Sequence, residues 1–374
     1  MVQVTSSVGR SLEDQLGVSP VEIRKDPRIL GHSVILIPQA SGNLEVLQES
    51  TDGTPITNRY GIPIIYSNNG SSVEVISPDN RHLLILEENP TIVGFGTYDR
   101  SSGFGADERF LAKGPFSTLS LELLIKAFIE RTRELQQGEK GSSLRQFLAY
   151  GTYRINDSST DSHQLSGRLL ASKEIAPNIH DELKNAAYYF QFHERSRCMY
   201  CDITKQESAS AHQKESRVVL YRNDEVYRKV RGKDVLLYDN GAIAFVPFAP
   251  IDQHNVHILT FKHTPRLTDL SDEQSRHLAD LLYKCLISIS EDAKVIGRDI
   301  HNLEFTLHSA PLYGRNGVNL IRNGDNVNEY SHLCIEISPR ESNSYRIPGS
   351  GWLIVPGRPK ETASRLKELI AKID

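Results

Sequence analysis

The feature that most constrains this chain is a pair of cysteines, Cys198 and Cys201, separated by two residues. The chain has only four cysteines in 374 residues, so half of them lie in one short segment. Two thiolates at this spacing can bind one cation from a single tight turn, and zinc then needs two further ligands from elsewhere in the fold. The candidates are histidines near two expected strands, namely His254, His257, His263 and His332, the last of which lies close to Cys334.

Two other interpretations of the cysteine pair remain open, namely buried free cysteines and a redox dithiol. A thioredoxin-like dithiol lies where a strand enters a long helix. The segment that follows Cys201 does not have the pattern of a long amphipathic helix. We therefore favour zinc over the redox interpretation.

The composition excludes several classes of function. Lys and Arg number 43 against 47 Asp and Glu, so the net charge of -4 gives no reason to expect binding to nucleic acid. A small nucleotide needs only a few local cations and remains possible.

The first twenty residues lack the apolar region of a signal peptide, and no apolar run is long enough to cross a membrane. Four cysteines do not form a disulfide framework, so we expect a cytoplasmic protein.

Hydrophobic periodicity predicts a mixture of helices and strands after a loose arm at 1–20. Apolar residues at helical spacing predict helices at 121–135, 271–289 and 360–373, and Ser271 with Gln274 forms a capping box at the start of the second. The glycine-rich segment at 94–105 is interpreted as a mobile loop. Strands are predicted at 33–38, 73–76, 83–86, 147–150, 168–171, 218–221, 235–238, 242–246, 256–261, 303–307 and 333–337.

The same order of elements occurs in both halves of the chain. Each half has strands, a Leu-Ser or Leu-Thr turn, a long amphipathic helix and further strands. This order indicates an internal duplication of an α+β unit with a mostly antiparallel sheet. We therefore predict domains at 21–190 and 191–374 after the arm.

Several ordered motifs of the second half are recognisable together. They are Cys-Met-Tyr-Cys-Asp-Ile at 198–203, Val-Pro-Phe-Ala at 246–249, Phe-Lys-His at 261–263, Leu-Thr-Asp-Leu-Ser-Asp-Glu at 267–273, Leu-His-Ser-Ala-Pro at 307–311 and Ser-His-Leu-Cys-Ile-Glu-Ile-Ser-Pro-Arg at 331–340. These motifs resemble those of galactose-1-phosphate uridylyltransferases and the related nucleotide-sugar phosphorylases of the histidine-triad superfamily. The resemblance runs from about Arg197 to the C-terminus, and in the first half it is limited to 22–27 and the helix after Ser117. It implies two tandem histidine-triad-like halves, the first of them degenerate.

The resemblance also implies a ligand set for the metal. In the family, the cysteine pair is completed by a histidine at the end of a strand and by the first histidine of the histidine motif. These positions are His263 and His332 here, so Cys198, Cys201, His263 and His332 would form a closed, structural zinc site. His254 and His257 are then expected to be surface or core histidines. Magnesium is left undecided, because no carboxylate cluster with ligand spacing is visible.

The family's catalytic motif is degenerate in this chain. Family members transfer a nucleotidyl group through the middle histidine of a His-x-His-x-Gln motif in the first half, because an imidazole both attacks and leaves readily near neutral pH. One register of this chain places Gln164, Ser166 and Arg168 at the three motif positions. The other register starts from His163 and places Leu165 at the attacking position. In neither register does a histidine attack.

Three residues are the remaining catalytic candidates. His163 could attack if its loop has shifted, although a lone histidine among Asp and Ser is more often a solvated loop residue. Cys334 occupies the middle motif position of the second half, where it is either a thiolate nucleophile or an inert core residue. Arg168 could hold a phosphate with two hydrogen bonds, or pair with a nearby carboxylate. Hydrolysis without a covalent intermediate is a further possibility, for which no residue can be named.

Two classes of function follow from the sequence. The first is a nucleotidyltransferase or phosphorylase-like enzyme that acts on a nucleotide sugar or a dinucleoside polyphosphate. The second is a family member that has lost catalysis and binds a nucleotide or a partner without turnover. The resemblance also implies a homodimer.

Overall fold

The computed structural model of the chain describes most residues from 104 onward and four short strands before them. The strands predicted at 73–76 and 83–86, and the candidate nucleophile His163, lie outside the described residues. The described residues are 22–25, 33–36, 65–67, 91–97, 104–113, 116–137, 144–155, 164–192, 197–211, 213, 216–222, 225–230, 233–239, 241–312, 326–346 and 353–373.

Ten strands form one sheet in the order β3-β4-β5-β7-β6-β13-β14-β12-β11-β8, and all of their pairings are antiparallel. The protein therefore belongs to the α+β class, as predicted. The strands are β3 (Ile65–Ser67), β4 (Thr91–Thr97), β5 (Phe104–Lys113), β6 (Gln146–Arg154), β7 (Gln164–Ser172), β8 (Val218–Arg222), β11 (Ala242–Phe245), β12 (Val256–Thr260), β13 (Asn302–His308) and β14 (Cys334–Pro339).

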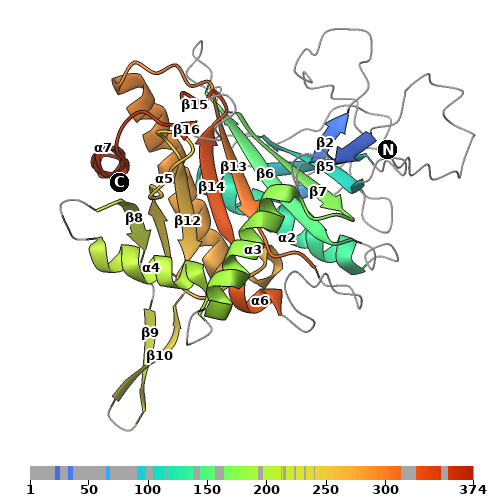
Figure 1. Cartoon of the computed structure of the whole chain (residues 1–374), viewed down its shortest axis with the longest axis horizontal. Helices are drawn as coiled ribbons and strands as arrows, with labels where there is room; N and C mark the ends of the chain where they lie inside the picture. Colours follow the sequence, from blue (N-terminus) through green and yellow to red (C-terminus); the bar gives the residue numbers. More distant parts are fainter. Residues whose placement is uncertain are drawn as a thin grey trace, which may run out of the picture.

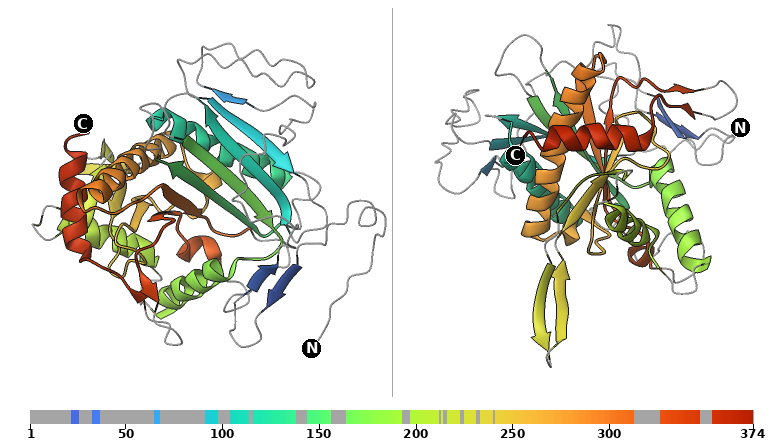
Figure 2. Two further views of the ribbon diagram at one scale, coloured as in Figure 1. Left: turned by 90° about the horizontal axis from the view of Figure 1, so that it is seen from above. Right: turned by 90° about the vertical axis from the view of Figure 1, so that its left-hand side faces the viewer.

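Three pairs of shorter strands lie outside the large sheet. One of these pairs is a hairpin that projects from the body of the molecule (Figure 2). The pairs are β1 (Glu22–Lys25) with β2 (Ser33–Leu36), β9 (Glu225–Val230) with β10 (Lys233–Asp239), which is the projecting hairpin, and β15 (Tyr345–Arg346) with β16 (Leu353–Ile354).

The strand order repeats itself about the centre of the large sheet. The succession β4, β5, helix α2 (Thr118–Gln137), β6, β7 gives the spatial order 4-5-7-6, and the succession β11, β12, helix α5 (Asp272–Val295), β13, β14 gives the order 11-12-14-13. The two sets meet where β6 pairs with β13. A duplicated unit would have this order, although the division at residues 20 and 190 stays a prediction.

One face of the sheet is covered by the helices that the sequence predicts. Helices α2 and α5 and the last helix α7 (Pro359–Ile370) contribute apolar side chains to one core with the inner face of the strands. The capping box of α5 is present, since the Ser271 hydroxyl accepts from the Gln274 N–H and the Gln274 side chain accepts from the Ser271 N–H. None of the helices in the described ranges is long and apolar enough to cross a membrane.

The opposite face of the sheet, which we call the front face, is crossed by helices that the sequence does not predict. These are α3 (Pro177–Phe192), α4 (Met199–Ser210) and the short α6 (Val327–Tyr330), and Figure 1 shows α3 and α4 in front of the strands. The sequence predicts no long amphipathic helix after Cys201, and α4 is a 12-residue helix that is not amphipathic. Helix α4 buries only Thr204 and Glu207, so it has no apolar stripe by which the sequence could reveal it.

The two ends of the glycine-rich segment at 94–105 lie in strands and not in the mobile loop that the sequence predicts. They belong to β4 and β5, which pair with each other as antiparallel strands. Ile92, Val93 and Phe95 supply the β-branched and aromatic residues that favour a strand. Gly94, Gly96 and Gly105 are therefore strand positions.

The junction of β6 with β13 requires a glycine. Gly151 pairs with Phe305, and a Cβ atom at position 151 would overlap the Phe305 ring, which is fully buried. We predict that Gly151→Ala lowers the free energy of unfolding by about 1–3 kcal/mol, the usual cost of overpacking a core. Urea denaturation measures this change. Phe305→Leu should relieve most of the added cost of the alanine, and an equal cost in both backgrounds would contradict the explanation.

Candidate metal centre and the front face of the sheet

Cys198, Cys201, His263 and His332 meet at one point of the structure. One ligand atom from each lies within 4.8 Å of the others. The Sγ atom of Cys201 is 3.3 Å from Nδ1 of His263 and 3.6 Å from Nδ1 of His332. The N-terminus of α4 supplies the cysteines, and the histidines lie just after β12 and just before β14. This cluster can hold a metal ion, and the identity of that ion stays a prediction.

The ring of His332 is oriented by Thr260. Its Nε2 atom is 3.0 Å from the Thr260 hydroxyl and 3.1 Å from the Thr260 carbonyl oxygen. The hydroxyl donates its only hydrogen to the Lys262 carbonyl at 2.8 Å, so towards His332 it can only accept. Nε2 of His332 must therefore carry a hydrogen, which leaves the lone pair of the neutral ring on Nδ1, towards the sulfur atoms.

His263 is held in the same way by a different partner. Its Nε2 atom lies 2.6 Å from the backbone carbonyl oxygen of Asn328, which can only accept. The lone pair of the neutral ring is again on Nδ1. Two sulfur and two nitrogen donors thus face one point, and each histidine donates its other N–H to an oxygen, as metal-binding histidines usually do. The donor set fits a four-coordinate zinc ion.

The two thiols of the cluster have unequal acidity. The pKa of Cys198 is well below its ordinary value, chiefly because the Cys201 thiol hydrogen-bonds to it. The same hydrogen bond raises the pKa of Cys201. One thiolate is therefore stabilised at the start of α4, where the helix dipole also favours negative charge.

The structure distinguishes between the two registers of the catalytic motif on β7. Leu165 is 2% exposed and belongs to the core that β7 shares with α2. Because side chains alternate along a strand, Ser166 and Arg168 lie on the front face. On β14, Ile335 and Ile337 belong to the same core, which places the motif position Cys334 on the front face. Of the two registers considered for the family motif, the one with Gln164, Ser166 and Arg168 puts its middle residue on the front face, and a catalytic role for these residues stays a prediction.

Cys334 is a poor candidate for a nucleophile. It is 6% exposed and packs among apolar residues that include Val218, Ile243 and Phe245. Burial raises the pKa of its thiol well above the ordinary value, and the nearby carboxylates add to this effect. Because the thiolate is the reactive form, a buried thiol that stays protonated is inert.

A row of polar side chains crosses the front face through Arg168. The guanidinium of Arg168 donates to the Tyr150 hydroxyl at 3.0 Å. Residues directly opposite each other on neighbouring strands lie on the same face, so the pairings extend this row across β7, β6, β13, β14 and β12. The row consists of Arg168, Tyr150, Thr306, Glu336 and His257. Arg168 stands at one end of this row, and the paired side chains of Glu336 and His257 stand at the other.

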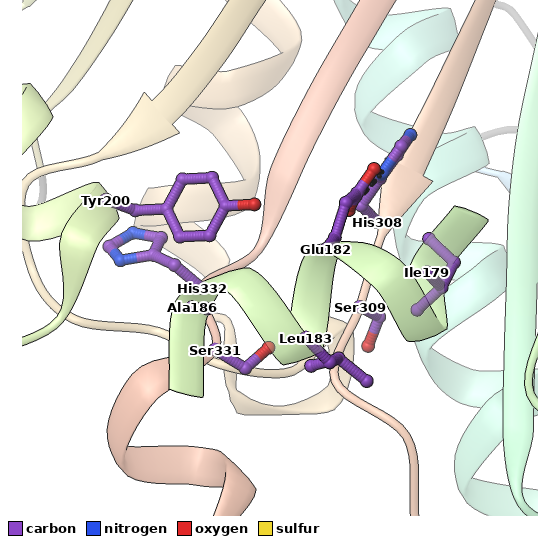
Figure 3. Close-up of a pocket in the computed structure, with 9 residues that line it drawn as sticks. All are labelled: Ile179, Glu182, Leu183, Ala186, Tyr200, His308, Ser309, Ser331 and His332. Carbon is purple, nitrogen blue, oxygen red and sulfur yellow. Dashed lines mark hydrogen bonds and ion pairs between the residues drawn. The ribbon is translucent and has the colours of Figure 1, made fainter. Parts of the chain in front are cut away.

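The ion pair belongs to a larger cluster that sequence reasoning missed. His308 of β13 lies between two carboxylates, with Nδ1 at 3.0 Å from Glu182 of α3 and Nε2 at 3.4 Å from Glu336. Glu336 also lies 3.6 Å from His257 and accepts from the Asn255 side chain at 2.9 Å. Figure 3 shows Glu182 and His308 side by side, and both line a small pocket that also contacts the metal-site residue His332. The sequence could place His308 on a strand, but not beside a helix that it did not predict.

Burial and charge act in opposite directions in this cluster. Burial alone would raise the pKa of Glu336, but the hydrogen bond and charge of His257 and the charge of His308 lower it to about 2. Burial also opposes protonation of His308, but the hydrogen bond and charge of Glu182 outweigh it and raise the pKa of His308. The cluster therefore favours a protonated His308 and an ionised Glu336.

The two histidines left out of the metal site have other partners, as expected. His254 is fully buried, with Nε2 at 2.9 Å from Asp292 and Nδ1 at 2.9 Å from the Arg298 guanidinium. It is a core histidine whose two ring nitrogens are both hydrogen-bonded. His257 is partly exposed and pairs with Glu336.

The chain was compared with known sequences and structures. No family model matches it, and no curated protein matches its sequence. A uridylyltransferase structure matches with a TM-score of 0.58 and 20% identity over 94% of this chain and 99% of the other. An ADP-glucose phosphorylase from Arabidopsis thaliana, solved with bound ADP-glucose, matches with a TM-score of 0.54 and 16% identity over 94% and 99%. This likeness confirms the α+β fold with an antiparallel sheet that the sequence resemblance implies, while the arrangement as two tandem halves stays a prediction.

The charges around His308 predict a pH dependence of stability. A pKa that is raised in the folded state stabilises the fold below the ordinary pKa of about 6.5, and this stabilisation is lost as the pH rises through the folded value. We expect wild-type protein to lose stability relative to His308→Gln between pH 6 and 9, by at most about 1.4 kcal/mol per pH unit. Urea denaturation across this range measures the difference. The exposed His301 provides the control, because His301→Gln should keep the wild-type slope.

Proposed function

We propose that this protein binds a nucleotide sugar or a dinucleoside polyphosphate on the front face of its sheet and transfers or releases the nucleoside monophosphate. The observation that carries the proposal is the position of Arg168. Its guanidinium lies on the front face, at the position where the family motif has its glutamine, and it donates to Tyr150 on the neighbouring strand. The shared fold with a uridylyltransferase and an ADP-glucose phosphorylase supports the same substrate class.

The residue at the attacking position argues against the covalent route. Ser166 occupies that position, and a serine hydroxyl attacks only when a base takes its proton. Cys334 is buried and protonated. Direct displacement remains: an oxygen of phosphate or water bonds to the α-phosphorus while the bond to the bridging oxygen breaks. The departing sugar phosphate or nucleotide keeps that electron pair, and when water attacks, the proton that water loses passes to the departing group or to solvent. Arg168 would bind non-bridging oxygens and offset the charge that develops on them.

A second candidate function rests on the residue at the attacking position. Ser166 stands where the first half of an active relative would carry the attacking histidine, and Cys334 stands at the middle motif position of the second half. A protein without the nucleophile could keep the nucleotide site and use it only for binding. Turnover decides between these candidates, because both require the nucleotide to bind.

Zinc is the metal we propose for the cluster of Cys198, Cys201, His263 and His332. All four positions of a tetrahedral site are filled by protein, which is typical of a structural site. The four residues would tie α4 to the ends of β12 and β14. A homodimer in the cytoplasm that binds no nucleic acid remains our expectation, and a need for magnesium stays undecided.

Metal analysis tests the zinc site. We expect about one zinc ion per wild-type chain by mass spectrometry of the metal content, and almost none in Cys201→Ser, because three ligands bind zinc far more weakly than four. The variant should also melt at a lower temperature, since binding to the folded state stabilises it. Cys285→Ala is the matched control, because this buried cysteine lies in α5 away from the cluster. Zinc retained in full by Cys201→Ser would contradict the assignment.

Substrate consumption tests the role of Arg168. Wild-type protein is incubated at neutral pH with nucleotide sugars and dinucleoside polyphosphates, with and without phosphate, and both substrate loss and intact protein mass are followed. We expect loss of a substrate without a nucleotidyl adduct, and at least about a tenfold lower rate for Arg168→Gln, since a bidentate phosphate contact is lost. Arg276→Gln, on the exposed side of α5, should behave as wild type.

The outcomes of this experiment are distinct. Binding without substrate loss would support the binding function over the enzyme. An adduct of one nucleoside monophosphate would contradict direct displacement and identify the true nucleophile. Neither binding nor turnover with any of these compounds would contradict both candidate functions.

A further inference from the structure

The hydrogen bonds around His332 continue beyond Thr260 into the core. The Lys262 carbonyl accepts a second hydroxyl, that of Thr264, at 3.1 Å. Thr264 in turn accepts from the Gln274 side chain at 3.2 Å, and Gln274 is the residue that closes the capping box of α5. A continuous chain of hydrogen bonds therefore joins the metal cluster to the start of α5.

Every side chain on this path is buried. Thr260 and Gln274 are 1% exposed, Thr264 is 2% exposed and His332 is 3% exposed. Each hydroxyl has one hydrogen, and each is donated to the Lys262 carbonyl, so both oxygens are acceptors in a fixed direction. Because water does not reach these groups, a lost acceptor is not replaced, and a buried donor without a partner is costly.

We propose that Thr260 is a positioning residue for the metal centre, which fixes His332 so that Nδ1 and not Nε2 binds the ion. The inference rests on the proposed zinc site. If Nε2 bound the ion instead, the ring would have to move so that Nε2 carried the lone pair and faced the sulfur atoms, and the hydrogen bonds from Nε2–H to the Thr260 oxygens would be lost. The Thr260 side chain and carbonyl together stabilise the orientation in which Nε2–H points at both of them.

The two histidines differ in whether a substitution can remove the hydrogen-bond acceptor that orients the ring. His263 depends on the backbone carbonyl of Asn328, which no substitution deletes. His332 depends partly on a hydroxyl, which Thr260→Val removes while keeping the shape of the side chain. The Thr260 carbonyl remains as one acceptor in that variant, so we expect the lower end of the roughly 10–100-fold loss of affinity that follows removal of such partners.

Competition with a chromophoric zinc chelator tests the proposal on the full chain. We expect Thr260→Val to bind zinc roughly tenfold more weakly than wild type, and Thr260→Ser, which keeps the hydroxyl, to stay within about threefold. Thr132→Val is the matched control, because Thr132 is 3% exposed in α2 and its hydroxyl has no partner among the described groups. Equal zinc affinity in wild type and Thr260→Val would overturn the positioning role.

A second measurement on wild-type protein keeps the proposal testable if Thr260→Val does not fold. The protein is loaded with cadmium-113 and labelled with nitrogen-15 in histidine, and the ring correlations then identify which nitrogen binds the metal. We expect Nδ1 for both His263 and His332, with a protonated Nε2. Coordination of His332 through Nε2 would overturn the inference while leaving the zinc site in place. A wild-type chain that binds neither zinc nor cadmium would overturn the site and the inference together.

Discussion

The antiparallel pairing of β6 with β13 holds the two sets of strands in one sheet, and the rest of the structure depends on it. Because the sheet continues without a break, α2 and α5 pack on the same face and share one core. The side chains of both sets on the other face then form a common surface. Gly151 permits this junction, since the buried ring of Phe305 fills the space that a side chain would need.

The front face brings together groups of different origin. Arg168 comes from the first set of strands, His308 and Glu336 from the second, and Glu182 from a helix that crosses between them. The guanidinium at one end of the surface is suited to phosphate, whereas the Glu182 and Glu336 carboxylates at the other end are paired with His308. Arg168 therefore offers the more suitable end for an anionic ligand, which agrees with its proposed role.

The metal cluster depends on backbone oxygens as much as on its four ligands. Each histidine could present either ring nitrogen to the ion, and partners that can only accept hydrogen bonds leave one choice. The Asn328 carbonyl joins α6 to His263 after β12, and the Thr260 carbonyl joins the end of β12 to His332 before β14. Both histidines also contact Cys201 of α4. If zinc binds there, it adds its stabilisation to a site that hydrogen bonds have already shaped.

The sequence alone determined the features that rest on local patterns. Helices α2 and α5 and the capping box at Ser271 follow from apolar periodicity and a short polar motif, because a helix that buries one face must carry it in its own sequence. The cysteine pair at 198 and 201 was also visible, because its two residues lie close together in the sequence. Helix α4 was not, since its burial comes from the elements around it and not from an apolar stripe of its own.

The tertiary structure alone decided the questions that depend on which side of a strand a residue occupies. The sequence permitted two registers for the catalytic motif, and only the packing of Leu165 against α2 showed that Ser166 and Arg168 face the front. The contact of Glu182 with His308 joins residues far apart in the chain, and no local pattern encodes that approach. The orientation of His332 likewise depends on Thr260, which comes close only when β12 pairs with β14.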